Sequence, residues 1–315
     1  MNFKNVIITI LLIIATVSCV ASSLSHPIAF SNKYKSGEQY MNIRLRGTLE
    51  LTIPKISELS GLAWDKDEKI LYAISDNADL YHLKPQIVNN TLVGIRLLSA
   101  YKLTKKNGKR LKSRDSEGLA ILNGQLIISF ERKPKIAKFT PKGRLISKYR
   151  LPKKLAKIKN YHSKNKALEA VTIHPRLGIL TAPEYPLKNT GNKHTIYSLK
   201  TKRKWTIPAY PAPNSAIVAL ETLKDGSILI LERAFSSILK PLIISVRRVW
   251  LSTCSCSKGD DSEFKQIAVF NNFKGWEIDN FEGLTHHKDN YFFMVSDDND
   301  SKLQKTLLTY WELVN

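Results

Sequence analysis

The sequence has few cysteines, and they form no recognisable metal-binding pattern. There are three in 315 residues, Cys19, Cys254 and Cys256. One residue separates Cys254 from Cys256, and no second pair exists to complete a structural zinc site. We expect these two cysteines either to form a small local disulfide or to remain free thiols.

Several familiar catalytic motifs are also absent. The chain contains no G-x-S-x-G, no H-E-x-x-H, and no P-loop or dinucleotide-binding glycine pattern. These absences argue against an α/β-hydrolase serine, a zinc protease and a nucleotide-binding enzyme. The adjacent His286 and His287 would point to opposite faces of a strand, which suits a turn better than a shared metal.

Long apolar runs are lacking in the same way. The run at residues 6–17 follows Lys4 and precedes small residues, and it falls short of the roughly 20 residues of a membrane span. This pattern is typical of a secretory signal, so we expect residues 1–21 to be a signal peptide. Alternatively, the letters TVSC form a lipobox that would leave Cys19 as a lipidated N-terminus. Both predict export to the periplasm or the cell exterior.

Acidic residues are outnumbered, with 27 Asp and Glu against 49 Lys and Arg, a net charge of +22. Such a surface attracts anions. The basic segments 102–114, 150–166 and 200–204 are expected to be exposed connections, the second with a short helix. Aromatic residues do not cluster among them as nucleic-acid stacking platforms would. We therefore expect an anionic small molecule or envelope ligand as partner, and a monomer.

Long amphipathic helix patterns are missing, whereas short β-rich runs between turn residues are abundant, which predicts an all-β protein. Five segments share a small residue, a short strand, a polar turn, a second apolar strand and a closing acid. The interval from small residue to acid is 13 to 15 residues. The small residues are Gly61, Gly118, Ala170, Ala219 and Gly283, and the acids are Asp76, Glu131, Glu184, Glu232 and Asp297.

Hairpins that recur about every 50 residues predict a β-propeller. A β-sandwich pair lacks so regular a long repeat, and β-helix coils are shorter. We expect five or six four-stranded blades, because the wide last interval has room for another. Residues 42–53 and 305–314 alternate like strands and are expected to pair and close the ring. Residues 22–41 would then be a short linker, and 42–315 a single propeller domain.

A second acid directly precedes the small residue in three repeats, as Glu117, Glu169 and Glu282. Equivalent blade positions lie at equal height and radius, so these carboxylates should converge near the channel axis. Like charges in that position need a cation or a proton, and calcium prefers oxygen ligands. The alternative is that the acids cap turns or pair with Lys and Arg.

Arginine follows two closing acids, as Arg132 and Arg233. A guanidinium suits two-point contact with phosphate or carboxylate, which suggests substrate binding. The alternative is an ion pair with an acid of a neighbouring blade.

Five motifs in order, ELSGLAW…LYAISD, DSEGLAIL…LIISFE, NKALEAVTI, DGSILILERAFS and NFEGLTHH…FFMVSDDN, resemble the phytase-like domain family, labelled "esterase-like activity of phytase". The similarity spans roughly residues 59–313. It implies a propeller of exported bacterial proteins, distantly similar to calcium-dependent β-propeller phytases. Those enzymes hydrolyse phosphomonoesters with water activated between calcium ions, while Lys and Arg hold the phosphate.

The resemblance also implies roles for individual residues. Matching positions include Arg233, Asp298 and Asn299, whereas Ser60 and Val218 depart from an acidic pattern. The implied catalytic residues are Glu117, Glu169 and Glu282, and the implied calcium ligands are Glu117, Glu131, Glu169, Glu232, Glu282, Asp297 and Asp298. The implied substrate-binding residues are Arg132, Arg233 and Lys166.

Two functions follow from these expectations. One is a calcium-dependent phosphoester hydrolase that acts on an anionic substrate. The other is a non-catalytic propeller that binds an anionic glycan, lipid or protein and holds structural calcium. A carboxylesterase ranks last, because no Ser-His-Asp set is identifiable.

Overall fold

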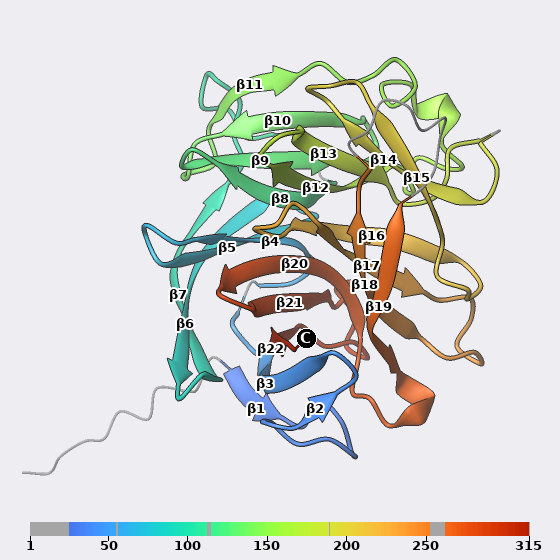
Figure 1. The fold of residues 1–315 in the computed structure, drawn as a ribbon. Helices are drawn as coiled ribbons and strands as arrows, with labels where there is room; N and C mark the ends of the chain where they lie inside the picture. Colours follow the sequence, from blue (N-terminus) through green and yellow to red (C-terminus); the bar gives the residue numbers. More distant parts are fainter. Residues whose placement is uncertain (1–24, 55, 112–114, 189, 253–261, 315) are drawn as a thin grey trace, which may run out of the picture.

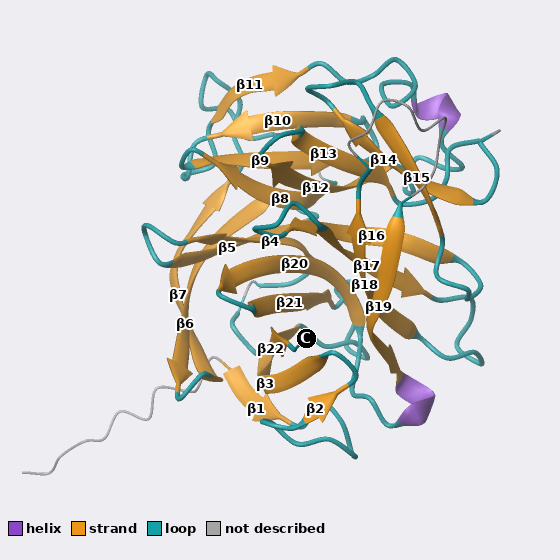
Figure 2. Cartoon of the chain, viewed as in Figure 1, coloured by secondary structure: helices purple, strands orange, loops and turns teal. Residues whose placement is uncertain are grey.

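The described residues form 22 strands and two short 3₁₀ helices. Strands dominate the view in Figure 2. A computed structural model describes residues 25–54, 56–111, 115–188, 190–252 and 262–314. The expected signal peptide, Cys19 and the pair Cys254 and Cys256 lie outside these residues. None of the helices in the described part is long and apolar enough to cross a membrane.

Four consecutive four-stranded antiparallel sheets form blades one to four. Blade one is β4 (Leu59–Asp65), β5 (Ile70–Ser75), β6 (Asp79–Val88) and β7 (Thr91–Lys102), and blade two is β8 (Ser116–Leu122), β9 (Gln125–Phe130), β10 (Lys135–Phe139) and β11 (Leu145–Tyr149). Blade three is β12 (Leu168–His174), β13 (Gly178–Pro183), β14 (Lys193–Ser198) and β15 (Lys204–Pro208), and blade four is β16 (Ser215–Thr222), β17 (Ile228–Ala234), β18 (Ile243–Trp250) and β19 (Glu263–Asn271).

Blade five joins the two ends of the chain. It combines β20 (Asn280–Lys288), β21 (Tyr291–Asp297) and β22 (Leu307–Leu313) with β3 (Ile43–Leu51). Strand β3 pairs antiparallel with β22, from Leu307 opposite Glu50 to Leu313 opposite Ile43, and the two lie side by side in Figure 1. The pairing between early and late strands is therefore present, as the alternation in the sequence predicts.

The edge of blade five differs from the expectation of four strands per blade. Strands β1 (Ser25–Ile28) and β2 (Gln39–Tyr40) both pair with β3, which gives this sheet six strands. These two strands come from the segment expected to be a linker. They cover the backbone of β3 at what would otherwise be an open sheet edge.

The inner strands form a closed ring of five. Strand β4 packs against β8, β8 against β12, β12 against β16, β16 against β20, and β20 against β4. The number of blades is thus five, at the lower end of the predicted range. Apolar side chains fill the space between neighbouring blades, as where Ile74 of blade one meets Ile128 and Phe139 of blade two. Burial of such surfaces stabilises each blade only through its neighbours.

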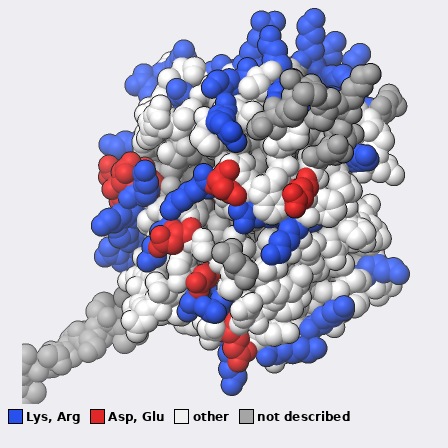
Figure 3. Space-filling view, viewed as in Figure 1, with Lys and Arg blue, Asp and Glu red and all other residues white. Residues whose placement is uncertain are grey.

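The connections follow the turn chemistry of the sequence. Asn89 and Asn90 have φ of 48° and 58° between β6 and β7, as a two-residue type I′ hairpin requires. The basic connection at 150–166 contains the 3₁₀ helix η1 (Ile158–Asn160), so the expected short helix is present. The second 3₁₀ helix is η2 (Asn272–Lys274). Lys and Arg side chains gather at the top of the view in Figure 3, above β10 and β11.

Glycine is required where inner strands meet backbone to backbone. A Cβ on Gly118 of β8 would lie 2.7 Å from the carbonyl oxygen of Glu169 and 2.8 Å from the amide nitrogen of Val171, both in β12. These backbone atoms cannot swing aside as a flexible side chain would. The small residues of the repeat therefore set the spacing of the ring.

We predict that Gly118→Ala lowers the free energy of unfolding by about 3 kcal/mol, because the added methyl group pushes β8 and β12 apart. Gly124→Ala is the matched control. Its Cβ meets nothing within 4 Å, and its φ of +68° makes the substitution cost about 1 kcal/mol. Urea denaturation measures both values, and equal losses would contradict the close-packed ring.

Candidate metal centre

The same β-bulge recurs at the start of every inner strand. The register between the first and second strand of each blade shifts there and leaves one extra residue on the inner strand. A bulge of this kind redirects a side chain away from the regular pleat. In blade order, the residues at the bulge are Ser60, Glu117, Glu169, Val218 and Glu282.

The acids at this position converge as the repeat predicts. Carboxylate oxygens of Glu117, Glu169 and Glu282 all lie within 4.8 Å of one another. A second triad, Glu131, Glu169 and Glu184, is equally close. The two triads share Glu169. All five glutamates of the triads are buried.

A second ring of side chains comes from the ends of the second strands. In each blade, one second-strand residue pairs with the residue just before the bulge, and the next residue along that strand belongs to this ring. These next residues are Asp76, Glu131, Glu184, Arg233 and Asp297. Blade four thus contributes an arginine where the other four blades contribute an acid. Together with the bulge positions, this end of the channel holds seven acids and one arginine.

Glu232 does not lie in this ring, contrary to its predicted role as a calcium ligand. Glu232 pairs with Ile217 in the ladder, whereas Arg233 has the place of the closing acid. Successive strand residues point to opposite faces, so Glu232 points away from the triads. It forms a two-point ion pair with Arg247, with Nε–Oε2 and Nη2–Oε1 distances of 2.5 and 2.7 Å. The sequence interval misplaced it because hairpin turns differ in length between blades.

Arg233 bridges acids from two other blades. Its Nη2 donates to Oε1 of Glu184 at 3.0 Å, and its Nη1 donates to Oε1 of Glu282 and to Oδ1 of Asn280. The Glu282 and Glu184 carboxylates outweigh the opposing effect of burial and raise the pKa of Arg233. The ion pair expected as the alternative role of this arginine is therefore present. Asn280, which the motif analysis missed, also donates to Glu282 at 3.0 Å.

One guanidinium leaves most of the acid charge unbalanced. Burial, followed by repulsion among the carboxylates, raises the pKa of Glu117 and Glu169 well above the ordinary range. Burial likewise raises the pKa of Glu131 to about 8 and that of Asp297 to about 7. A hydrogen bond between Asp76 and Glu117 lowers the pKa of Asp76, but burial raises it overall. Such a bond between two acids requires a shared proton.

Asp298 has a different place from the other predicted ligands. Its Oδ1 accepts from the amide of Glu58 at 2.9 Å, and its Oδ2 accepts from the hydroxyl of Thr306 at 2.8 Å. The first bond ties the loop after β21 to the segment before β4, and the second lies within that loop. Asp298 belongs to neither triad. Asp297 is nearer to the centre, where Oδ1 accepts from the amide of Asn299 at 2.7 Å.

Of the three basic residues predicted to bind substrate, Arg233 lies within this end of the channel, whereas Arg132 and Lys166 lie around it. Arg132 has a side chain 57% exposed and contacts Asp115 at 3.0 Å. Lys166 lies over the ring of Tyr185, 4.6 Å from its centroid. Lys166 lines a pocket of about 690 Å³ together with His162 and Tyr185. Arg132 lies beside this pocket, where its Nε donates to Oδ1 of Asn165. Tyr185 directly follows Glu184, so this pocket adjoins the second triad.

The donor set fits a hard cation. The triads offer carboxylate oxygens alone, the type of ligand that calcium prefers. Oε2 of Glu184 is buried without a hydrogen-bond partner among the described residues, and an unpaired buried oxygen of this kind is costly. A cation between the triads would satisfy it and would offset the repulsion that otherwise favours protons.

Comparison with solved structures finds matches of low similarity. The PQQ-bound aldose sugar dehydrogenase of Streptomyces coelicolor is 10% identical, with a TM-score of 0.44, 88% of this chain covered and 98% of that chain. The Cps50 (Swd1) β-propeller domain of Myceliophteria thermophila is 9% identical, with a TM-score of 0.41, 92% of this chain covered and 98% of that one.

Sequence comparisons give a more specific result. A search among curated proteins finds no significant match. The family model described as "Phytase-like: Esterase-like activity of phytase" matches residues 54–300. This range contains all five inner strands, both triads and Arg233. The chain belongs to the phytase-like family.

Proposed function

We propose that this protein is an exported, calcium-dependent phosphoester hydrolase whose reaction centre is the pair of acid triads. The observation that supports it most is the meeting of the triads at Glu169. Seven acids face one arginine at this end of the channel, an arrangement that is unfavourable without bound cations or protons. Family membership is consistent with hydrolysis of an ester.

The chain's own residues would divide the work of such a reaction. Glu117, Glu169 and Glu282 would hold calcium together with Glu131 and Glu184. Bound calcium would neutralise phosphate oxygens and lower the pKa of a coordinated water. Asp76 lies beside Glu117 and belongs to neither triad, so its carboxylate is placed to take the proton that the attacking water loses.

Substrate would be held from the loops around the triads. Lys166 and His162 line the adjoining pocket of about 690 Å³, and Arg132 extends into solvent nearby. Cationic side chains at this rim attract a polyanion before it reaches the acids. Arg233 keeps Glu282 and Glu184 in position, and its partly exposed guanidinium can also contact a phosphate.

One observation favours the alternative, a propeller that binds an anionic ligand without catalysis. Glu184 and Glu169 are only 4% and 6% exposed, and ions buried among the triads would act as a structural link between blades two, three and five. In that case calcium stabilises the fold, but no phosphate ester is hydrolysed. Both functions involve calcium binding, and only the hydrolase turns over a phosphate ester.

Chelator-treated protein should become less stable as the pH rises. The unfolded chain loses the Glu131 proton near the ordinary pKa of 4.5, whereas the folded protein retains it up to about 8. Stability should therefore fall as the pH rises from about 4.5 to about 8, and the melting temperature should drop by several degrees. Glu131→Gln should flatten this slope, and Glu312→Gln, on the outer part of blade five, should not.

Calcium should reverse the loss at pH 8, because the bound ion replaces the protons. A melting temperature that responds to neither pH nor calcium would contradict a cation site in the triads.

Turnover of a phosphate ester should depend on calcium. Release of p-nitrophenol from p-nitrophenyl phosphate should require calcium and stop when chelator is added. Glu169→Gln removes the acid that both triads share and should reduce kcat/KM by at least about 100-fold. Glu312→Gln, the same chemical change at a distant ion pair with Arg46, should leave it unchanged.

The result decides between the two functions. Calcium that raises the melting temperature of the native protein without any phosphatase activity, on this ester or on phytate, would leave the binding propeller as the function.

A further inference from the structure

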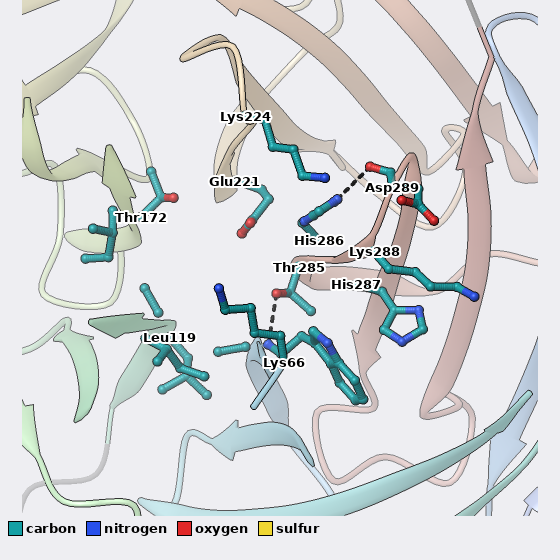
Figure 4. Close-up of a pocket in the computed structure, with 15 residues that line it drawn as sticks. Lys66, Leu119, Thr172, Glu221, Lys224, Thr285, His286, His287, Lys288 and Asp289 are labelled. Carbon is teal, nitrogen blue, oxygen red and sulfur yellow. Dashed lines mark hydrogen bonds between the residues drawn. The ribbon is translucent and has the colours of Figure 1, made fainter. Parts of the chain in front are cut away.

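A second pocket lies at the opposite end of the channel. It has a volume of about 420 Å³, and all five blades contribute to it (Figure 4). Its residues come from the later parts of the inner strands, such as Trp64 in β4, Thr172 in β12 and Glu221 in β16, or from the turns beyond. The triads occupy the beginnings of the same strands. At about 3.3 Å per residue, three to five residues separate the two sites by roughly 10–16 Å.

Apolar side chains close the channel between the two ends. Leu62, Val171 and Leu284 surround a space of only about 10 Å³, which is no larger than a single water molecule needs. A ligand in the second pocket therefore cannot reach the triads through the channel. The pocket is a separate compartment and not an extension of the metal centre.

Lysines provide the charge of this compartment. Lys66, Lys224 and Lys288 line it from three different blades. Lys66 and Lys224 form no ion pair or hydrogen bond with any described residue. In Figure 4 the Lys66 side chain extends into the pocket, and the Lys224 side chain lies across from it beside Glu221 and His286. Two unpaired ammonium groups over one cavity attract an anion.

Neighbouring titratable groups do not cancel this charge. Burial raises the pKa of Glu221 to about 8, and the amide of His286 is hydrogen-bonded to it. The raised pKa reduces the negative charge that Glu221 presents to the pocket at neutral pH. Burial also lowers the pKa of His287 to about 4. Asp289 is exposed at the outer edge.

The wall beneath the lysines is apolar. Leu119, Ile121 and Ile173 line it, with the ring of Trp64 nearby. A bare inorganic ion would leave this surface in contact with water, whereas an organic body would cover it. The volume is within the range of small-molecule sites, about 300–1,000 Å³.

We propose that this pocket is a second ligand site, which takes a small organic anion with an aromatic or aliphatic body. The anionic group binds between Lys66 and Lys224, and the body packs on Leu119 and Ile121. This site does not depend on the proposed hydrolysis, because it shares no residue with the triads.

Isothermal titration calorimetry with three probes tests whether the pocket requires both an anionic group and an apolar body. Naphthalene-2-carboxylate carries both ring and charge, 2-naphthalenemethanol carries the ring alone, and acetate carries the charge alone. Naphthalene-2-carboxylate should bind at one site per chain, at least about tenfold tighter than either of the others, and more weakly at high salt. Equal binding of the alcohol or of acetate would overturn the proposal.

Variants place the binding in this pocket. The double substitution Lys66→Gln and Lys224→Gln should weaken naphthalene-2-carboxylate about tenfold or more. The control, Lys33→Gln with Lys240→Gln, removes the same charge from exposed lysines outside the pocket and should change affinity less than twofold. If both pairs reduce binding equally, the net charge and not the pocket binds the anion.

A third comparison separates this site from the metal centre. Glu169→Gln, with or without calcium, should leave the affinity for naphthalene-2-carboxylate unchanged, provided that its melting curve remains cooperative. A tenfold loss in that variant would mean that the probe binds at the triads, which would also contradict the proposal.

Discussion

Repulsion among buried carboxylates at the axis of the ring is the constraint on which the site depends. Five inner strands start at the same height, and a bulge in each one directs a side chain to the axis. Three of these side chains are glutamates, and acids from the neighbouring strand ends surround them. The closed ring holds these like charges together, because each blade is fixed by its two neighbours and the pairing of β3 with β22 completes blade five. The stability of the fold and the chemistry of the site are therefore linked through the same atoms.

Arg233 shows how the chain relieves part of this repulsion itself. It occupies the position where the other blades have an acid, and it donates to Glu184 and Glu282 from their two different blades. One positive charge cannot balance seven acids, so several carboxyls retain protons or share a cation. This balance explains why the site should respond both to pH and to calcium. It also explains why both a hydrolase and a calcium-stabilised binding propeller are consistent with one arrangement.

The sequence predicts much of the fold and part of the site, for identifiable reasons. The small residue and the acid before it recur because each blade needs close backbone contact and the same bulge, so the convergence of Glu117, Glu169 and Glu282 could be predicted. The sequence did not predict that Arg233, and not Glu232, takes the position of the closing acid in blade four. A one-residue difference in turn length reverses the face of the strand on which a side chain lies. Strands β1 and β2 could not be predicted, because their sequences are too short and too polar to be distinguished from a linker. The pocket lined by Lys66 and Lys224 could not be predicted, because its residues are spread over five blades and form no sequence motif.

The measurement that tests the account most directly is calcium titration of chelator-treated protein by isothermal calorimetry at pH 7, with wild type and Glu169→Gln in parallel. The account predicts a saturable calcium site in the wild type, release of protons as calcium binds, and loss of that site in the variant. Proton release is expected because the raised pKa values of the triads mean that calcium must displace bound protons. Wild-type protein that is folded but shows no calcium binding, or binding that Glu169→Gln leaves unchanged, would contradict the assignment of the triads as a metal centre.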